Sequence, residues 1–331
     1  MEDIRSKKVI GNCNSGVNVI FNNRYMRKLP FFPKLKRDWR MLLLLTPSLV
    51  LIFIFCYMPM YGLVIAFQNY KVGAPLLTFD GSIEWVGLEH IWRFLSSIFF
   101  LRIFSNTLRL SFLSIICGSS VSIVFALLLN EIRHVNFKKS VQTFVYMPYF
   151  ISTVIVVAML LSFISSDGII NQIREIFGHE KIAFINNPNY FDLIYILSGI
   201  WQTFGYSAVI YIAVISSIDP NLYDAATVDG ANRLQRMLHI TVPGITPTII
   251  ILLILSVGGV LNSNTEKIIL MYNPSIYEKA DVIGSYVYRM GIIEVQYSYT
   301  TAVGLFSSLI NFTLLYMTNL LSRKVSDYSL W

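Results

Sequence analysis

Histidine and cysteine are the residue types that most often bind metals or act in catalysis, and in this sequence they are scattered. No HExxH or CxxC spacing occurs among His90, His134, His179, His239, Cys13, Cys56 and Cys117. No GxxxxGK[ST] phosphate-binding loop occurs either. The sequence therefore predicts no catalytic residue, no metal site and no ATPase activity of its own.

The segment 219–243 has the signals of a compact helical hairpin. Asp219-Pro220 is typical of a helix start, because the carboxylate caps free N–H groups and proline suits the first turn. Asp229-Gly230 indicates a turn, since glycine accepts a positive φ without steric cost. A second helix is expected over 231–240, with Pro243 separating it from the next apolar run. The small alanine side chains of the hairpin leave a shallow surface that fits a groove on another protein.

The elements that position this hairpin are expected to be membrane-spanning helices. Of 331 residues, 55% are hydrophobic and 14% charged, against roughly 45–50% and 25% in soluble domains. A span needs about 20 mainly apolar residues. The predicted fold is therefore all-α, an integral membrane protein with six transmembrane helices at about 41–67, 105–130, 141–164, 193–218, 244–262 and 301–321. Charges interrupt 85–104 and 268–293, which are expected to be amphipathic or interfacial pieces on the outer side of the membrane.

The basic residues predict the orientation of these spans. Seventeen lie in the first 40 residues, the 131–140 and 219–243 loops and the tail, whereas eight are spread over the longer opposite loops. Cytoplasmic loops carry an excess of Lys and Arg. Residues 1–40 are thus expected to be a cytoplasmic extension, 41–321 the transmembrane domain and 322–331 a cytoplasmic tail. The net charge of +7 reports orientation rather than a nucleic-acid partner.

The hairpin sequence Asp224-Ala-Ala-x-x-Asp-Gly-Ala231, with Ile240-x-x-Pro243 after it, resembles the EAA loop of ATP-binding-cassette (ABC) importer permeases. That family's motif begins with Glu where this chain has Asp224. The resemblance implies a type I ABC importer fold, in which this loop is the coupling helix that docks on an ATP-binding subunit. It implies that the docking contact is made by Asp224, Ala225, Ala226, Asp229, Gly230 and Ala231. An ordinary connecting hairpin is the alternative.

Further motifs resemble the carbohydrate-uptake branch of that family, similar to the maltose-transporter permeases. They are Asn106-Thr107, Met147-Pro-Tyr-Phe-Ile-Ser152, Gly168-x-x-Asn171 and Trp201-x-x-x-Gly205, and the C-terminal part looks like the polysaccharide/lipoprotein permease subgroup. This resemblance implies import of oligosaccharides, acidic ones included, by alternating access across a bacterial plasma membrane. It implies a homologous second permease, two ATP-binding subunits that hold the ATP and Mg²⁺, and an extracytoplasmic solute-binding protein as partners. No cofactor is expected on this chain itself.

A sugar site within a membrane needs hydrogen-bonding groups and aromatic rings on which to stack. Polar groups inside a span cost free energy unless they are satisfied, so they indicate candidates. The first cluster, in the fourth span, is Trp201, Gln202, Tyr206 and Tyr211, and an interfacial aromatic belt is the alternative for Trp201. The second cluster, where the fifth span ends, is Asn262, Asn264 and Glu266, with helix C-capping by asparagine as its alternative.

Arg102 and Arg109, near the start of the second span, could attract the carboxylate of an acidic sugar. Snorkelling of Arg109 to the interface is the alternative. A function of another class, an ion-gradient-driven secondary transporter of a polar solute, predicts inverted repeats and charged midplane residues, and the sequence shows neither clearly. A membrane-embedded enzyme would need acid–base or metal-binding residues grouped at one depth.

Overall fold

The computed structural model describes residues 39–73, 76, 83–262 and 264–325. Among these residues the regular structure is helical, apart from one isolated bridge between Gln68 and Trp85. The all-α prediction is therefore confirmed. Six segments are long and apolar enough to cross a membrane: Trp39–Phe67, Phe100–Asn130, Thr153–Ile176, Pro188–Ser217, Arg233–Val257 and Tyr297–Lys324. Most of the predicted N-terminal extension, the end of the predicted tail, Cys13 and Ser263 lie outside the described residues.

The first apolar segment lies mainly in a compact unit of its own, which ends at Tyr61. Its elements are α2 (Trp39–Ile52), the π-helical turn η2 (Phe53–Tyr57) and α3 (Met58–Met60), and the 3-10 helix η3 (Tyr61–Phe67) follows. None of the side chains of α2, η2 and α3 is buried, and Leu44 is 78% exposed. An apolar helix without a buried face needs lipid or another subunit around it.

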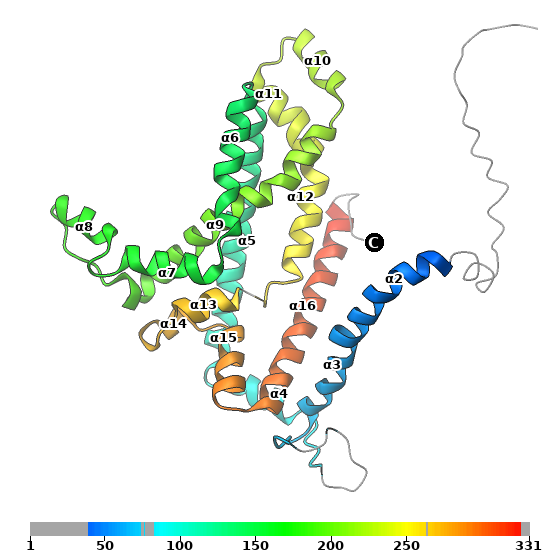
Figure 1. Cartoon of the computed structure of the whole chain (residues 1–331), viewed down its shortest axis with the longest axis vertical. Coiled ribbons are helices and arrows are strands. Elements are labelled where there is room, and N and C mark those ends of the chain that lie inside the picture. The colour runs from blue at the N-terminus through cyan, green and yellow to red at the C-terminus, as the bar shows by residue number, and fades with distance from the viewer. Residues whose placement is uncertain (1–38, 74–75, 77–82, 263, 326–331) are drawn as a thin grey trace, which may run out of the picture. The chain divides into compact units, whose positions relative to one another are not determined.

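The second unit is built around two long helices that pack along each other, α5 (Phe100–Asn130) and α9 (Pro188–Ser217). Beside them, α12 (Val242–Val257) packs on α9 and on α16 (Tyr297–Val325) (Figure 1). One apolar core joins α5, α9 and α12 through fully buried side chains, among them Ala126, Ala208 and Ile245. Another core joins Leu110 of α5 to Phe191 of α9.

The third predicted span, 141–164, is interrupted by a proline. The structure has α6 (Val135–Tyr146), the 3-10 turn η4 (Met147–Phe150), α7 (Thr153–Ile164) and, after a break, α8 (Ile169–Ile176). Pro148 lacks the N–H that a continuous helix would use. The chain therefore turns at η4 and restarts at Ser152, whose hydroxyl caps α7.

The segment that follows the fifth span is partly buried rather than superficial. It forms α13 (Thr265–Met271), η7 (Pro274–Ile276), α14 (Tyr277–Ala280), α15 (Ile283–Tyr288) and η8 (Arg289–Ile293). Lys267, Ile268 and Val282 are at most 2% exposed. The short α4 (Glu89–Leu95) packs on α16 and buries Phe94 completely. Apolar residues between the charges are buried in the second unit. The mean hydropathy of each segment does not reveal this, because the charged residues lower it.

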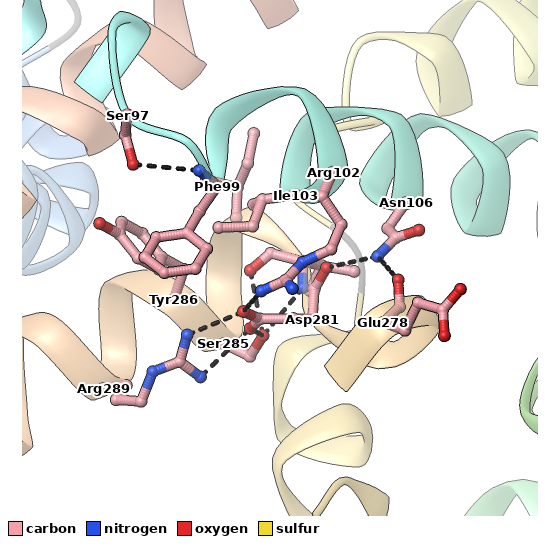
Figure 2. Close-up of polar contacts among 12 residues, drawn as sticks. Ser97, Phe99, Arg102, Ile103, Asn106, Glu278, Asp281, Ser285, Tyr286 and Arg289 are labelled. Atoms are coloured by element: carbon pink, nitrogen blue, oxygen red, sulfur yellow. Dashed lines mark hydrogen bonds and ion pairs between the residues drawn. The ribbon is translucent and has the colours of Figure 1, made fainter. Parts of the chain in front are cut away.

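A buried carboxylate fastens this segment to α5 (Figure 2). The Asp281 side chain accepts hydrogen bonds from Arg289 at 2.8 and 3.3 Å and from Ser285 at 2.8 Å, and an Arg102 nitrogen lies 3.8 Å away. Asn106 of α5 donates to the backbone carbonyls of Glu278 and Asp281 at 2.9 and 3.1 Å. The polar residues near the start of the second span therefore anchor α14 and α15.

Candidate functional site

The predicted coupling hairpin lies at one end of the second unit, and α4 and α15 lie at the other (Figure 1). Asp219 caps α10 (Pro220–Val228) by accepting the N–H of Asn221 at 2.9 Å. Gly230 then turns the chain with a φ of +80°, in the left-handed region that favours glycine. A reciprocal cap between Asn232 and Gln235 starts α11 (Arg233–Arg236). The structure thus contains two short helices joined by a glycine turn.

The second helix of the hairpin does not stop at Pro243, so the expected separation from the fifth span is wrong. α11 continues through the π-helical turn η6 (Met237–Thr241) directly into α12. In that turn the N–H of Val242 bonds to the carbonyl of Met237, five residues back. The wider turn accommodates a proline that has no N–H to donate. The hairpin is therefore a direct extension of the fifth span.

Two side-chain contacts fasten α10 to this continuous helix. The Tyr223 hydroxyl lies 2.9 Å from Oγ1 of the buried Thr241, and Arg236 donates to Thr227 Oγ1 at 2.6 Å. Two of the predicted coupling residues, Ala226 and Ala231, are half-buried, whereas the other four, Asp224, Ala225, Asp229 and Gly230, are exposed. Val228, between them, is 88% exposed. The hairpin presents small, acidic and apolar groups on a firmly held surface.

A cavity of about 540 Å³ is lined by α5, α9, α12 and η4. Its polar lining consists mostly of hydroxyl side chains, from Ser114, Ser119, Ser122, Thr203, Ser207 and Ser256. Its aromatic lining consists of Tyr149, Tyr206 and Tyr211. Tyr149 and Tyr206 stack with ring centroids 3.9 Å apart, and Tyr211 is buried. This combination suits a polar molecule whose rings have apolar faces.

A second cavity, of about 160 Å³, adjoins the first and shares Ser114, Gly118 and Thr203 with it. Gln202 lines it and donates to the Ile151 carbonyl at 3.1 Å. Lys267 of α13, which lies outside the six spans, lines it as well. Burial lowers the pKa of Lys267 to about 8. The two cavities thus place a cation beside a set of neutral hydrogen-bonding groups.

Residues 118–327 match the profile of a protein family described as "Binding-protein-dependent transport system inner membrane component". The chain belongs to this family. It is 40% identical to the polygalacturonan/rhamnogalacturonan transport system permease protein YteP of Bacillus subtilis, over 95% of this chain and 96% of that protein. It is 39% identical to Protein LplB of the same organism, over 90% of this chain and 92% of that protein.

Two solved structures contain chains similar to this family member. A bacterial ABC transporter involved in the import of the acidic polysaccharide alginate matches with a TM-score of 0.80 and 38% identity, over 89% of this chain and 98% of that chain. A bacterial alginate ABC transporter in complex with an alginate pentasaccharide-bound periplasmic protein matches with a TM-score of 0.81 and 38% identity, over 91% and 99%. These matches confirm the predicted type I importer fold, and the chain is a non-enzymatic permease subunit of an ABC transporter.

The predicted substrate residues of this permease do not gather in one place. Tyr206 and Tyr211 line the larger cavity, and Gln202 and Asn264 line the smaller one. The other three, Trp201, Asn262 and Glu266, are exposed and line neither of these cavities. The alternative role predicted for the second cluster was helix C-capping by asparagine. Asn264 does cap a helix, but at the N-terminus of α13.

Several cavity residues were not among the sequence-based candidates. Ser114, Gly118 and Ser122 recur every four residues, a spacing that places them on one face of a helix and could have revealed a small polar stripe. Tyr149 lies within the Met147–Ser152 motif and received no role of its own. Lys267 is one of the eight basic residues in the loops on the predicted outer side, and no local sequence pattern distinguishes it from the others.

The two arginines near the start of the second span have carboxylate partners within this chain. Arg109 lies 3.1 Å from Asp192 and donates to the Lys279 carbonyl at 3.1 Å. Arg102 lies near Asp281 (Figure 2). Neither arginine lines the two cavities. Their contacts hold α5 to α9 and to the segment after α13, so a role in attracting substrate gains no support.

Proposed function

We propose that this chain is the permease subunit through which an ABC importer moves oligosaccharides, acidic ones derived from polysaccharides included, across a bacterial plasma membrane. The observation that carries the proposal is the 540 Å³ cavity, in which serine and threonine hydroxyls surround the Tyr149–Tyr206 pair. Its volume is within the range of small-molecule sites. A sugar ring has hydroxyls at its rim and C–H groups on its faces, which match the two kinds of lining. The names of two relatives support the same class: polygalacturonan/rhamnogalacturonan for YteP and the acidic polysaccharide alginate for the solved importer.

The coupling residues are proposed to contact an ATP-binding subunit, which holds the ATP and Mg²⁺. Asp224, Ala225, Asp229 and Gly230 are exposed, and Val228 adds an apolar tip that a groove would cover. The continuous helix from 233 to 257 connects this contact to the cavity, because Leu252 and Ser256 line the cavity from α12. A displacement of the hairpin therefore moves part of the cavity wall, which is what alternating access requires.

The remaining partners follow from the exposed surfaces and the family. The helices α2, η2 and α3 of the first span have no buried side chain, and a homologous second permease and lipid are proposed to cover them. A solute-binding protein is proposed to deliver the sugar at the end of the second unit that carries α4 and α15. Both chain termini and the hairpin are proposed to be cytoplasmic, in keeping with the basic residues of their segments.

Reconstitution tests the proposal. The permease is placed in proteoliposomes with its second permease, its ATP-binding subunits and its binding protein, and uptake is measured across a panel of oligosaccharides. We expect uptake and sugar-stimulated ATPase activity for polysaccharide-derived oligosaccharides, and neither for a control without ATP. Equal uptake without ATP and without ATP-binding subunits would support the ion-gradient alternative instead and sink the importer proposal.

A further inference from the structure

Lys267 is a buried cation with few partners inside the chain. Its side chain packs on α9, where Nζ donates to the Tyr195 carbonyl at 2.9 Å and lies 4.9 Å from the centroid of the Tyr195 ring. An ammonium group has three N–H donors. Within the part of the chain that the structure describes, Nζ makes this one hydrogen bond. No carboxylate oxygen of those residues lies within 4.0 Å of it.

The contrast with Asp281 makes this arrangement unusual. Asp281 and Lys267 are the two charged residues that are completely buried among the described residues. Asp281 has Arg289 and Arg102 as counter-ions and Ser285 as a hydrogen-bond donor. A buried charge is costly unless it is paired. Lys267 therefore has the desolvation cost of a buried ion without the intramolecular carboxylate that would offset it.

The surroundings of Lys267 are those of a ligand site rather than of an apolar core. It lines the 160 Å³ cavity together with neutral polar groups, among them Ser114, Gln202, Thr203 and Asn264. That cavity adjoins the larger one in which Tyr149 and Tyr206 stack. A molecule in the larger cavity would thus have a positive charge and amide and hydroxyl groups at one end.

We infer that Lys267 is the group that binds the carboxylate of an acidic oligosaccharide, a uronate ring, at the smaller cavity. The inference rests on the proposed function. The two N–H donors that the Tyr195 carbonyl does not engage would bind the carboxylate, while Gln202, Asn264 and Thr203 bond to ring hydroxyls. A lysine is a point charge and does not clamp a carboxylate in the bidentate manner of arginine. Such a contact distinguishes charged from neutral sugars and still allows successive rings to pass.

Binding to the assembled importer tests this assignment. The complete complex is placed in lipid nanodiscs, and the affinities of a galacturonate pentasaccharide and of its fully methyl-esterified form are measured directly. Lys267→Met removes the charge and keeps the side-chain length. We expect it to weaken binding of the acid on the order of 10- to 100-fold, the range of one hydrogen bond to a charged group, and to leave the ester unchanged. Lys267→Arg should retain the preference for the acid.

Two further variants guard against effects on folding and on net charge. Lys267→Gln keeps a donor for the Tyr195 carbonyl, so it is measured alongside Lys267→Met in case the latter fails to assemble. Lys279→Gln removes the same charge from a lysine whose Nζ contacts Asn189 outside both cavities, and it should leave both affinities unchanged.

An equal loss of affinity for acid and ester in the Lys267 variants would indicate a purely structural lysine and overturn the inference. Unchanged binding of the acid would overturn it as well. A wild-type complex that binds neutral but not acidic oligosaccharides would overturn it and leave the proposed function standing. A wild-type complex that binds no oligosaccharide would overturn both.

Discussion

The rings of Tyr149 and Tyr206 stack almost in parallel, with centroids 3.9 Å apart and planes 7° apart. Tyr149 belongs to η4, the turn at Pro148 between α6 and α7, and Tyr206 belongs to α9. The stack therefore joins the interruption of one helix to the middle of another, at the wall of the larger cavity. It makes a break in the helix part of the proposed sugar site.

Replacing Tyr206 by Ala should lower oligosaccharide uptake about 2- to 12-fold, because a stacked aromatic contact contributes about 0.5–1.5 kcal/mol beyond its buried area. Tyr206→Phe keeps the ring and should retain most uptake. The control is Tyr316→Ala, which removes an exposed tyrosine of α16 that lies outside both cavities. If Tyr206→Ala and Tyr316→Ala transport equally well, the larger cavity is not the sugar site.

Gly205 should tolerate no side chain. A Cβ there would lie 2.5 Å from the Val145 carbonyl oxygen, a backbone atom of α6. Gly205→Ala is expected to destabilise the protein by about 1–3 kcal/mol, as overpacking does. Gly304→Ala is the matched control, because a Cβ on that glycine of α16 meets nothing within 4 Å. Thermal unfolding of the complex in detergent measures the stability of both variants. Equal unfolding midpoints for Gly205→Ala and Gly304→Ala would contradict the close approach of α9 to α6.

Asp281→Ala should be strongly destabilising, since it leaves the Arg289 guanidinium without its buried counter-ion (Figure 2). Breaking a buried pair costs about 3–5 kcal/mol. Asp167→Asn removes a carboxylate that is 92% exposed and pairs with Lys181, and it should leave the unfolding midpoint nearly unchanged because solvent screens an exposed pair. If the two variants unfold at nearly the same temperature, the Asp281 cluster does not anchor α14 and α15.

Gly230→Val should uncouple transport from ATP hydrolysis by distorting the hairpin turn. A left-handed conformation costs a residue with a side chain about 1–2 kcal/mol, and Gly230→Asn should be better tolerated. Gly178→Val is the matched control, because that glycine has a φ of +76° and open space around it but lies outside the hairpin. The readout is sugar-stimulated ATPase activity at equal assembly. Identical stimulation in the two valine variants would refute the coupling role.

The affinity for acidic oligosaccharides should fall as pH rises through about 8, because burial lowers the pKa of Lys267 to that value and the ammonium is charged below it. A bound carboxylate favours the charged form and shifts this midpoint upward. The elements packed on α13 are α7, which has no ionisable side chain, α9, from which Tyr195 faces the ammonium, and α15, with Tyr286 and Tyr288. Binding measured from pH 6.5 to about 9.5 should be flat for Lys267→Met. If the affinity of Lys267→Met falls with pH as that of the wild type does, the titrating group is not Lys267.

The sequence by itself determined the class of fold, the number of spans and the place of the hairpin. These depend on local properties: apolar runs of sufficient length, the Asp219-Pro220 helix start, and Gly230 at a turn that needs a positive φ. The resemblance of Asp224 to Ala231 to a known loop gave the family, because that motif is a continuous stretch of chain.

The tertiary structure alone decided which polar residues face one another. Tyr149 and Tyr206 are 57 positions apart by number, and they meet because Pro148 turns the chain beside α9. Trp201 and Glu266 are chemically suitable for sugar binding, yet both are exposed and line neither cavity, since other residues of their helices line the two cavities. Lys267 is the opposite case, because it belongs to a charged loop segment yet is buried and lines the smaller cavity. Whether a lysine is solvated or buried beside a cavity depends on the helices packed around it, and these come from distant parts of the chain.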